Sequence, residues 1–256
     1  RLLTKLAVTH RAHIAILVHD AQSRRDRHLP RAHPSSVRRM DVVDAVHSRS
    51  SIRQFLPDPV GDDVLRSLLA DASRAASGGN VQPWRIYVVN GESMARLREF
   101  LPTQPPIEAT EYDIYPPKLT EPYRTNRFAI GEQMYATLGI EREDKAGRLR
   151  QFAHNGDFFG APAALFCFVD RQMGPPQWSD LGMFLQTFML LAVERGLATC
   201  AQEYWSVRQG AVRSFVGAPD NEMLFCGMAI GHADPAAAVN SLRSERMPLD
   251  QWARFV

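Results

Sequence analysis

A strongly apolar stretch from Asp180 to Arg195 constrains the fold more than any other part of the sequence. Its composition predicts a helix that lies in the core, with other elements packed around it. Gly196 follows directly, in the position where glycine commonly ends a helix. The high Met and Phe content indicates packing rather than a cofactor-binding stretch. The apolar residues are Met183, Phe184, Leu185, Phe188, Met189, Leu191 and Ala192.

Two further apolar segments have the length and composition of buried β-strands. These are Ala163–Val169 (AALFCFV) and Met223–Ile230 (MLFCGMAI). Trp84–Val89 predicts a third strand, and the Asn90-Gly91 dipeptide after it predicts a turn. No internal repeat or linker divides residues 40–256, so we expect one α+β domain there.

Four more helices are predicted around these strands. Asp41–His47 and Glu92–Leu101 are short. A longer helix has its apolar residues at three- and four-residue steps, with Asp62 placed to cap its start and turn residues at its end. Ser206 is placed to cap the fourth helix, which reaches Val216 before Gly217. The stepped residues of the longer helix are Leu65, Leu68, Leu69, Ala72 and Ala76, and its turn is Ser77–Asn80.

Residues 1–39 differ from the rest in charge. They carry nine basic residues against two acidic ones, hence a charge of +7, whereas the remainder has 21 basic and 26 acidic residues, hence −5. We interpret Met40 as the natural start and 1–39 as a poorly ordered, non-native extension, with an Arg-rich targeting leader as the alternative. The mildly acidic remainder gives no broad electrostatic reason to expect nucleic-acid binding.

The three cysteines, Cys167, Cys200 and Cys226, lie far apart in the sequence. They form no CxxC pair, so neither a metal site nor a disulfide framework is indicated. A reducing, cytoplasmic location is therefore the default expectation. The apolar runs are too short or too interrupted to predict a membrane span.

The segment from Arg49 to Phe55 places two guanidinium groups and two hydroxyls within five residues. Arginine presents a fixed fork of donors that suits a phosphate, and serine hydroxyls add short donors beside it. In an extended chain Arg49, Ser51 and Arg53 share one face, because side chains alternate. The segment therefore predicts an anion site, with a solvated basic patch as the alternative.

Residues 102–127 are rich in Pro and Tyr and show no period, which is typical of a substrate lid or binding loop, although an ordinary surface excursion is the alternative. Its aromatic and basic side chains suit an aromatic or acidic ligand. The two arginines could instead pair with Glu108, Glu111 or Glu121 at the surface. The candidate substrate contacts are Tyr112, Tyr115, Tyr123, Arg124 and Arg127.

Four motifs in this order resemble the nitroreductase family of FMN-dependent oxidoreductases. They are SRSSIRQF (48–55), SGGNVQPW (77–84), GLATCAQE (196–203) and LRSERMPL (242–249). Four ordered motifs spread across residues 41–256 are more specific than any single one. The middle of the chain, around Glu121–Arg124 and Gly174–Trp178, is similar to nitrobenzoate-reductase-like members.

The resemblance implies an α+β fold with a central, mainly antiparallel sheet flanked by helices, in an intertwined homodimer with FMN at the subunit interface. It assigns the phosphate, ribityl chain and pyrimidine edge to Arg49, Ser50, Ser51 and Arg53, with Arg246 closing on the phosphate. Arg53 would also place positive charge near flavin N1. Ser244 stands where some relatives have lysine, which puts that contact in doubt.

The resemblance also assigns the residues around the flavin ring. Ser77 and Asn80 would border it, Asn80 across the dimer, and Gln82 and Pro83 would shape the same wall. Ala201, Gln202 and Glu203 would bring backbone amides to flavin N5. Trp84 is expected in the core, and no catalytic protein nucleophile is indicated.

The implied reaction is hydride transfer from NAD(P)H through FMN to a nitroaromatic or related small aromatic acceptor, by a ping-pong mechanism. The sequence does not decide between NADH and NADPH, because it holds no dinucleotide fingerprint. Three alternatives keep the same flavin site: reductive dehalogenation, enal reduction, or flavin breakdown. A flavin-binding protein with little turnover is a further alternative of another class.

Overall fold

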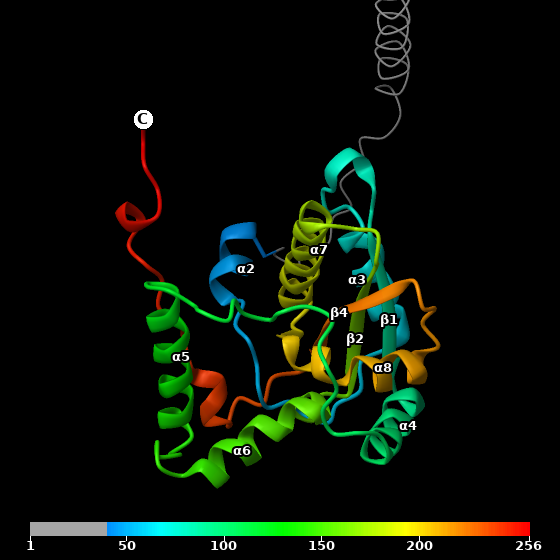
Figure 1. Cartoon of the computed structure of the whole chain (residues 1–256), viewed down its shortest axis with the longest axis horizontal. Helices are drawn as coiled ribbons and strands as arrows, with labels where there is room; N and C mark the ends of the chain where they lie inside the picture. The colour runs from blue at the N-terminus through cyan, green and yellow to red at the C-terminus, as the bar shows by residue number, and fades with distance from the viewer. Residues whose placement is uncertain (1–39) are drawn as a thin grey trace, which may run out of the picture. The chain divides into compact units, whose positions relative to one another are not determined.

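The computed structural model describes residues 40–256, so the expectations for residues 1–39 lie outside the described part. Helices and strands are interspersed along the chain (Figure 1). In chain order they are α2 (Val42–Ser48), α3 (Asp62–Ala72), β1 (Trp84–Asn90), α4 (Glu92–Phe100), α5 (Tyr123–Thr137), α6 (Lys145–Ala153), β2 (Ala163–Asp170), α7 (Pro175–Glu194), β3 (Ala198–Gln202), α8 (Gln209–Val216) and β4 (Glu222–Gly231).

The four strands form one antiparallel sheet in the order β1-β2-β4-β3. The three predicted strands are confirmed, and together with the flanking helices they confirm the α+β class. The fourth strand, β3, was not among the predicted strands; within it Cys200 pairs with Ala229 of β4. At five residues β3 is too short to show a period, and its pairing with β4 decides its conformation.

Side chains of β2 alternate between two separate cores, as period two requires. Leu165 and Cys167 join a core with Leu68 of α3 and Phe188 of α7 on one face of the sheet. On the other face Phe166 packs with Trp205 in a core that also contains residues of α4 and α8. The apolar helix α7 is thus a central core element, as predicted.

Several predicted helix boundaries shift in the structure. Gly61, not Asp62, is the N-cap of α3, and that helix ends at Ala72. Helix α7 begins at Pro175 rather than Asp180, because the two prolines at its first positions suit a helix start. Ser206 does not cap α8; it lies buried in the 3-10 turn Glu203–Arg208.

The glycine predictions at the helix ends are confirmed. Gly196 after α7 has φ 72° and Gly217 after α8 has φ 69°, the left-handed conformation that ends helices without a steric penalty. Within residues 40–256, no helix is both long and apolar enough to cross a membrane.

Helices α5 and α6 were not predicted from the sequence. No residue of α5 is buried, so no apolar stripe marks it as a helix. The region predicted as irregular, 102–127, therefore ends earlier: Tyr123 already begins α5. The extended segment that remains runs from residue 104 to residue 122, and we call it the strap.

After β4 the chain returns past α5, and its tail projects beyond that helix (Figure 1). The tail contains one short 3-10 turn, Leu249–Gln251. Its large apolar side chains bury little surface in this chain: Trp252 is 66% exposed and Phe255 93% exposed. Apolar side chains left open in this way usually mark an interface.

Candidate functional site

The basic segment after α2 lies along the edge strand β3. Ser51 forms a parallel bridge with Thr199, and the Ile52 N–H donates to the Thr199 carbonyl at 3.1 Å. Ile52 is buried, whereas Arg49, Ser51 and Arg53 face the opposite way into one pocket of about 370 Å³. The prediction that these three side chains share a face is confirmed.

The C-terminal motif closes the other side of this basic pocket. Arg243 donates to the Ser50 hydroxyl at 3.1 Å, and the Arg53 N–H donates to Asn240 Oδ1 at 2.9 Å. Arg246 donates to both the carbonyl and the hydroxyl of Ser244, at 3.0 and 2.6 Å. Ser244 thus holds Arg246 at the pocket, a role that its short side chain can perform.

Four arginines gather at this pocket. Within residues 40–256, neither Arg49, Arg53, Arg243 nor Arg246 forms an ion pair with a carboxylate. The pKa of Arg49 is lowered, first by burial and then by the positive charge of Arg246. Neighbouring guanidinium groups that repel each other in this way favour an anion between them.

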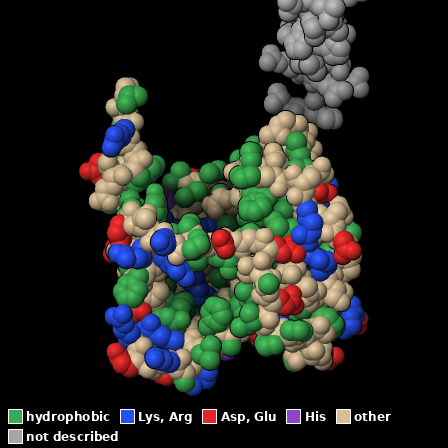
Figure 2. Space-filling view, viewed as in Figure 1, with side chains coloured by type: hydrophobic (Ala, Val, Ile, Leu, Met, Phe, Trp, Pro, Cys, Tyr) green, Lys and Arg blue, Asp and Glu red, His purple; other side chains and the backbone are tan. Residues whose placement is uncertain are grey.

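A second pocket, of about 500 Å³, continues from the first and shares Arg53 with it. Figure 2 shows this face hollowed between α5 and α7, with Lys and Arg side chains along the hollow. The walls come from the strap, α5, α6 and the end of β3. Its lining is Arg53, Ile114, Tyr115, Arg127, Ile130, Gly131, Met134, Tyr135, Gln151, Phe152, Asn155, Phe159, Cys200, Ala201, Gln202, Glu203, Tyr204, Val207 and Leu242.

Three of these residues interact at the wall formed by the strap and α5. The Arg127 guanidinium lies 4.1 Å from the centre of the Tyr115 ring, a cation–π contact. Burial raises the pKa of Glu203, and Tyr115 and Arg127 partly oppose that effect. Burial and then the charge of Glu203 raise the pKa of Tyr115. This wall therefore combines an aromatic face with both signs of charge.

Gln202 is present at the second pocket, but its side chain is committed elsewhere. It is 3% exposed, and its amide donates to the carbonyl and the side chain of Asn155 at 3.0 and 3.1 Å. Its side chain is therefore not available to a ligand, and the expected role of the backbone amides stays a prediction. Ala201 and Glu203, on either side, are exposed in the pocket.

The segment from Ser77 to Pro83 lines neither pocket of its own chain. It forms a tight turn in which Ser77 Oγ accepts from the Gln82 N–H at 3.0 Å. Asn80 and Gln82 adopt φ values of 58° and 50°, which non-glycine residues take up only where surrounding structure enforces it. The buried carboxylate of Asp180 accepts from the Gly78 N–H at 3.3 Å. The four predicted ligands here thus sit on a fixed turn apart from the arginines.

The predicted substrate residues separate into two groups. Tyr115 and Arg127 line the second pocket. Arg124 instead pairs with Glu121 at 2.5 Å on the surface, and Tyr123 is 61% exposed outside both pockets. Tyr112 is partly buried against the core, and its hydroxyl donates to the Phe225 carbonyl.

Apart from Arg127, sequence reasoning assigned neither Arg243 nor the pocket side chains of α5 and α6 to the site. Arg243 stood in a recognised motif, so its charge was a usable signal. Tyr135 of α5 and Gln151 of α6 carried no local signal, because a residue of an unrecognised helix is placed only by tertiary packing. Within residues 40–256 no group of three or more His, Cys, Asp or Glu residues could hold a metal ion.

Comparison with known proteins identifies the family. A sequence model of the Nitroreductase family matches residues 46–232. The 4-nitrobenzoate reductase of Pseudomonas putida is 36% identical, covering 84% of this chain and 96% of that protein. The nitrobenzene nitroreductase of Ectopseudomonas oleovorans is 35% identical, again over 84% of this chain and 96% of that protein.

Solved structures agree with the sequence comparison. The FMN and NADPH-dependent nitroreductase NfnB from Sphigopyxis sp. strain HMH superposes with a TM-score of 0.80 at 44% identity, covering 85% of this chain and 99% of that one. NfnB from Mycobacterium smegmatis, solved in complex with NADPH, has a TM-score of 0.78 at 29% identity, covering 84% and 100%. The chain belongs to the nitroreductase family.

Proposed function

We propose that this chain is an oxidoreductase that uses FMN to pass hydride from NAD(P)H to a nitroaromatic acceptor. One observation carries the proposal: a pocket of arginines that form no ion pair with a carboxylate of residues 40–256 joins, at Arg53, a larger pocket with aromatic and polar walls. A flavin mononucleotide has the matching form, a dianionic phosphate at one end and a flat apolar ring at the other. The family relatives named FMN-dependent support the same assignment.

The residues present fit the cofactor at its phosphate end. Burial and the positive charge of Arg246 lower the pKa of Arg49, so an anion between the two guanidinium groups would be favourable. Ser50 and Ser51 add hydroxyl donors, and Arg243 holds Ser50 in place. Arg53, common to both pockets, would bring positive charge to the pyrimidine edge. When bound, FMN supplies the two-electron chemistry, and these side chains bind and orient it.

The remaining predicted ligands support a homodimer. Ser77, Asn80, Gln82 and Pro83 lie outside the pockets of their own chain, so they would reach the ring only from a second copy. Exposed apolar surface is available for such an interface on α2, where Val42 is 73% exposed, and on the C-terminal tail. The three free, buried cysteines favour a reducing cytoplasmic location.

Arg127 is the best-placed side chain to select an acidic aromatic acceptor. It lines the second pocket and, within residues 40–256, makes no ion pair with a carboxylate. Replacing it by glutamine should raise KM for 4-nitrobenzoate roughly tenfold, the value of one charge-assisted hydrogen bond, and leave KM for nitrobenzene nearly unchanged. Equal changes for the two acceptors would remove Arg127 from substrate selection.

The proposed function is tested by the visible absorption spectrum of the purified protein under anaerobic conditions. A yellow protein that bleaches with NADPH or NADH and regains its colour with a nitroaromatic would support the cofactor, the donor and the acceptor together. A colourless protein that cannot be reconstituted with FMN would overturn the proposal. Parallel reciprocal plots would support ping-pong kinetics, and a panel of nitro, halophenol and enal compounds separates the alternative reactions.

A further inference from the structure

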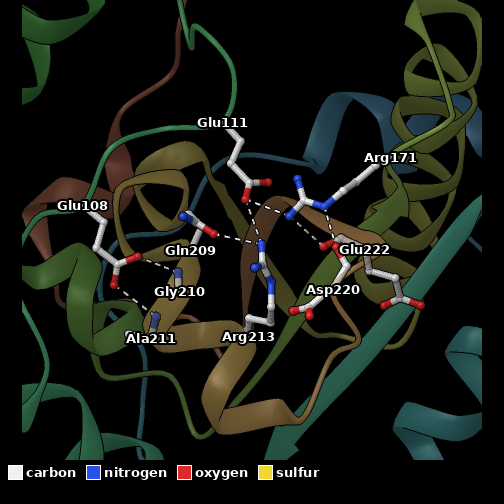
Figure 3. Close-up of polar contacts among 9 residues, drawn as sticks. All are labelled: Glu108, Glu111, Arg171, Gln209, Gly210, Ala211, Arg213, Asp220 and Glu222. Atoms are coloured by element: carbon white, nitrogen blue, oxygen red, sulfur yellow. Dashed lines mark hydrogen bonds and ion pairs between the residues drawn. The ribbon is translucent and has the colours of Figure 1, made fainter.

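Two glutamates attach the strap to the body of the protein (Figure 3). Glu108 lies at the start of α8, where its carboxylate accepts from the N–H groups of Gly210 and Ala211 at 2.5 and 3.0 Å. The first amides of a helix have no partner within the helix, so a carboxylate there is favourable. The Glu108 N–H also donates to the Val207 carbonyl at 2.8 Å.

Glu111 makes the second attachment, which we call the clamp. Its Oε1 accepts from both Arg171 and Arg213 at 2.8 Å (Figure 3). Arg171 also donates to the Asp220 carbonyl at 2.6 Å, and Arg213 to Gln209 Oε1 at 3.0 Å. The clamp therefore joins the strap to the loop after β2 and to α8.

The clamp is partly shielded from water. The Glu111 side chain is 19% exposed and that of Arg213 is 22% exposed. Burial alone would raise the pKa of Glu111, but the hydrogen bonds from the two arginines outweigh it and the pKa is lowered. Glu111 is thus charged at neutral pH, and partly desolvated pairs of this kind hold their geometry better than exposed ones.

The residues that follow Glu111 connect the clamp to the wall of the second pocket. The Tyr112 ring packs on Trp178 and Phe225, with centroids at 5.7 and 6.2 Å, and its hydroxyl is bonded to the Phe225 carbonyl. Three residues later Tyr115 lies in the pocket wall beneath Arg127. A chain held at 108, 111 and 112 leaves little freedom for residue 115.

We infer that Glu111 is a positioning residue for the acceptor: by clamping the strap to Arg171 and Arg213 it fixes Tyr115, and hence Arg127, in the wall of the substrate pocket. The strap is therefore a fixed wall rather than a lid that opens with each turnover, because opening would break all these bonds together. This inference rests on the proposed function for its substrate, but the clamp itself can be tested without turnover.

The kinetic test uses Glu111→Gln, with Asp71→Asn as the matched control, because Asp71 also pairs with an arginine, Arg195, at 2.7 Å. Asp71 and Arg195 line neither pocket. Glu111→Gln should raise KM for 4-nitrobenzoate roughly fivefold to tenfold, the scale of a charge-assisted hydrogen bond. The flavin spectrum, the rate of reduction by NADPH and kcat should stay within about twofold of wild type, since a positioning residue affects binding alone.

A double-mutant cycle decides whether Glu111 acts through Tyr115. If it does, Glu111→Gln should have no further effect on KM in a Tyr115→Ala background, because coupled residues are not additive. Additive effects, or an unchanged KM in the single variant, would overturn the inference. Should Glu111→Gln fold poorly, Arg171→Gln breaks one arm of the clamp and leaves Arg213 to neutralise Glu111.

Amide hydrogen exchange tests the clamp when turnover is absent. The amides of Glu108, Gly210 and Ala211, whose hydrogen bonds fix the strap to α8, should exchange at least roughly tenfold faster in Glu111→Gln than in wild type or Asp71→Asn, because the strap opens more readily once the charged bonds are lost. Unchanged exchange there would overturn the clamp, whatever the activity. A wild-type protein that fails to reduce nitroaromatics, yet shows the faster exchange in the variant, would overturn the proposed function alone.

Discussion

At the scale of single residues, Arg49 shows how the site is prepared for its ligand. It follows α2 as the C-cap residue, so the end of that helix places its side chain at the pocket. Burial and the nearby charge of Arg246 both lower its pKa, so its charged form is disfavoured without an anion. A bound phosphate would offset both effects. Under the proposed function, binding of the cofactor phosphate would relieve the repulsion between Arg49 and Arg246.

Arg49→Ala should weaken FMN binding. Loss of a charge-assisted contact to phosphate costs about 1.5–3 kcal/mol, which corresponds to a dissociation constant roughly 10-fold to 150-fold higher. The measurement is titration of FMN fluorescence with apoprotein. Arg195→Ala is the control, since it removes an arginine that pairs with Asp71 on the surface. An affinity in Arg49→Ala equal to that of the control would contradict the phosphate assignment.

Tyr87 predicts how stability responds to alkaline pH. Its hydroxyl donates to Glu222 Oε2 at 2.8 Å, and burial, followed by that bond and charge, raises its pKa from 10.0 to about 12. Between these values the unfolded chain has lost a proton that the folded chain retains. The free energy of unfolding should therefore fall as pH rises through this interval.

Tyr87→Phe should remove this part of the pH dependence. Urea midpoints of wild type and variant should differ by a constant amount below pH 10, the ordinary value for tyrosine, and converge above it. Spectrophotometric titration of the tyrosines provides an independent check. Parallel stability curves throughout the alkaline range would show that the raised pKa of Tyr87 does not contribute.

At the scale of secondary structure, the strands followed from the sequence and two helices did not. β2 and β4 are buried along almost their whole length, so continuous apolar runs identified them. α3 was recognised by its regular apolar steps, of which Leu65, Leu68 and Ala72 are buried. α5 has no buried residue, so its sequence lacked the stripe on which such recognition depends.

Gly227 in β4 should not tolerate a larger side chain, because Trp205 of the 3-10 turn Glu203–Arg208 packs directly against it. A Cβ atom there would overlap the indole of Trp205, which is fully buried and stacks on Phe158 at 4.4 Å. Gly227→Ala should lower the free energy of unfolding by about 1–3 kcal/mol through overpacking. Gly174→Ala is the matched control, since its Cβ would meet only Pro176 at an ordinary 3.9 Å. Chemical denaturation of both variants measures the free energy of unfolding, and an equal loss in the two would contradict the overpacking.

At the scale of the whole molecule, the residues predicted to bind the cofactor lie in two regions that one chain does not bring together. The arginine pocket lies where α2, β3 and the C-terminal motif meet. The turn from Ser77 to Pro83 is anchored instead at Asp180 of α7. The proposed homodimer explains both this separation and the exposed apolar tail, because each site would take the turn from the other subunit.

Mixed dimers test this arrangement. Arg49→Ala and Asn80→Ala homodimers should each bind FMN weakly, because every site carries one lesion. A heterodimer of the two variants should have one intact site and recover about half the wild-type FMN content, since both lesions fall in the other site. Arg49→Ala combined with Arg246→Ala should recover none. Equal FMN content in the two heterodimers, purified with two different tags, would contradict a shared site.

The sequence by itself determined the family, the α+β class, the three longest strands and three of the four arginines that line the basic pocket. These features are local: each depends on apolar period or on a short motif whose residues are neighbours in the chain. They could therefore be recognised without knowing which segments meet.

Only the tertiary structure decided which side chains meet across the site. Along the sequence, Glu111 lies 60 residues from Arg171 and 102 from Arg213, so no local sequence pattern predicts the clamp. Arg124 and Arg127 are three positions apart on α5, yet one pairs with Glu121 and the other enters the pocket. The physical reason is that pairing depends on distance in space, which the folded sheet and its covering helices set, and not on separation along the chain.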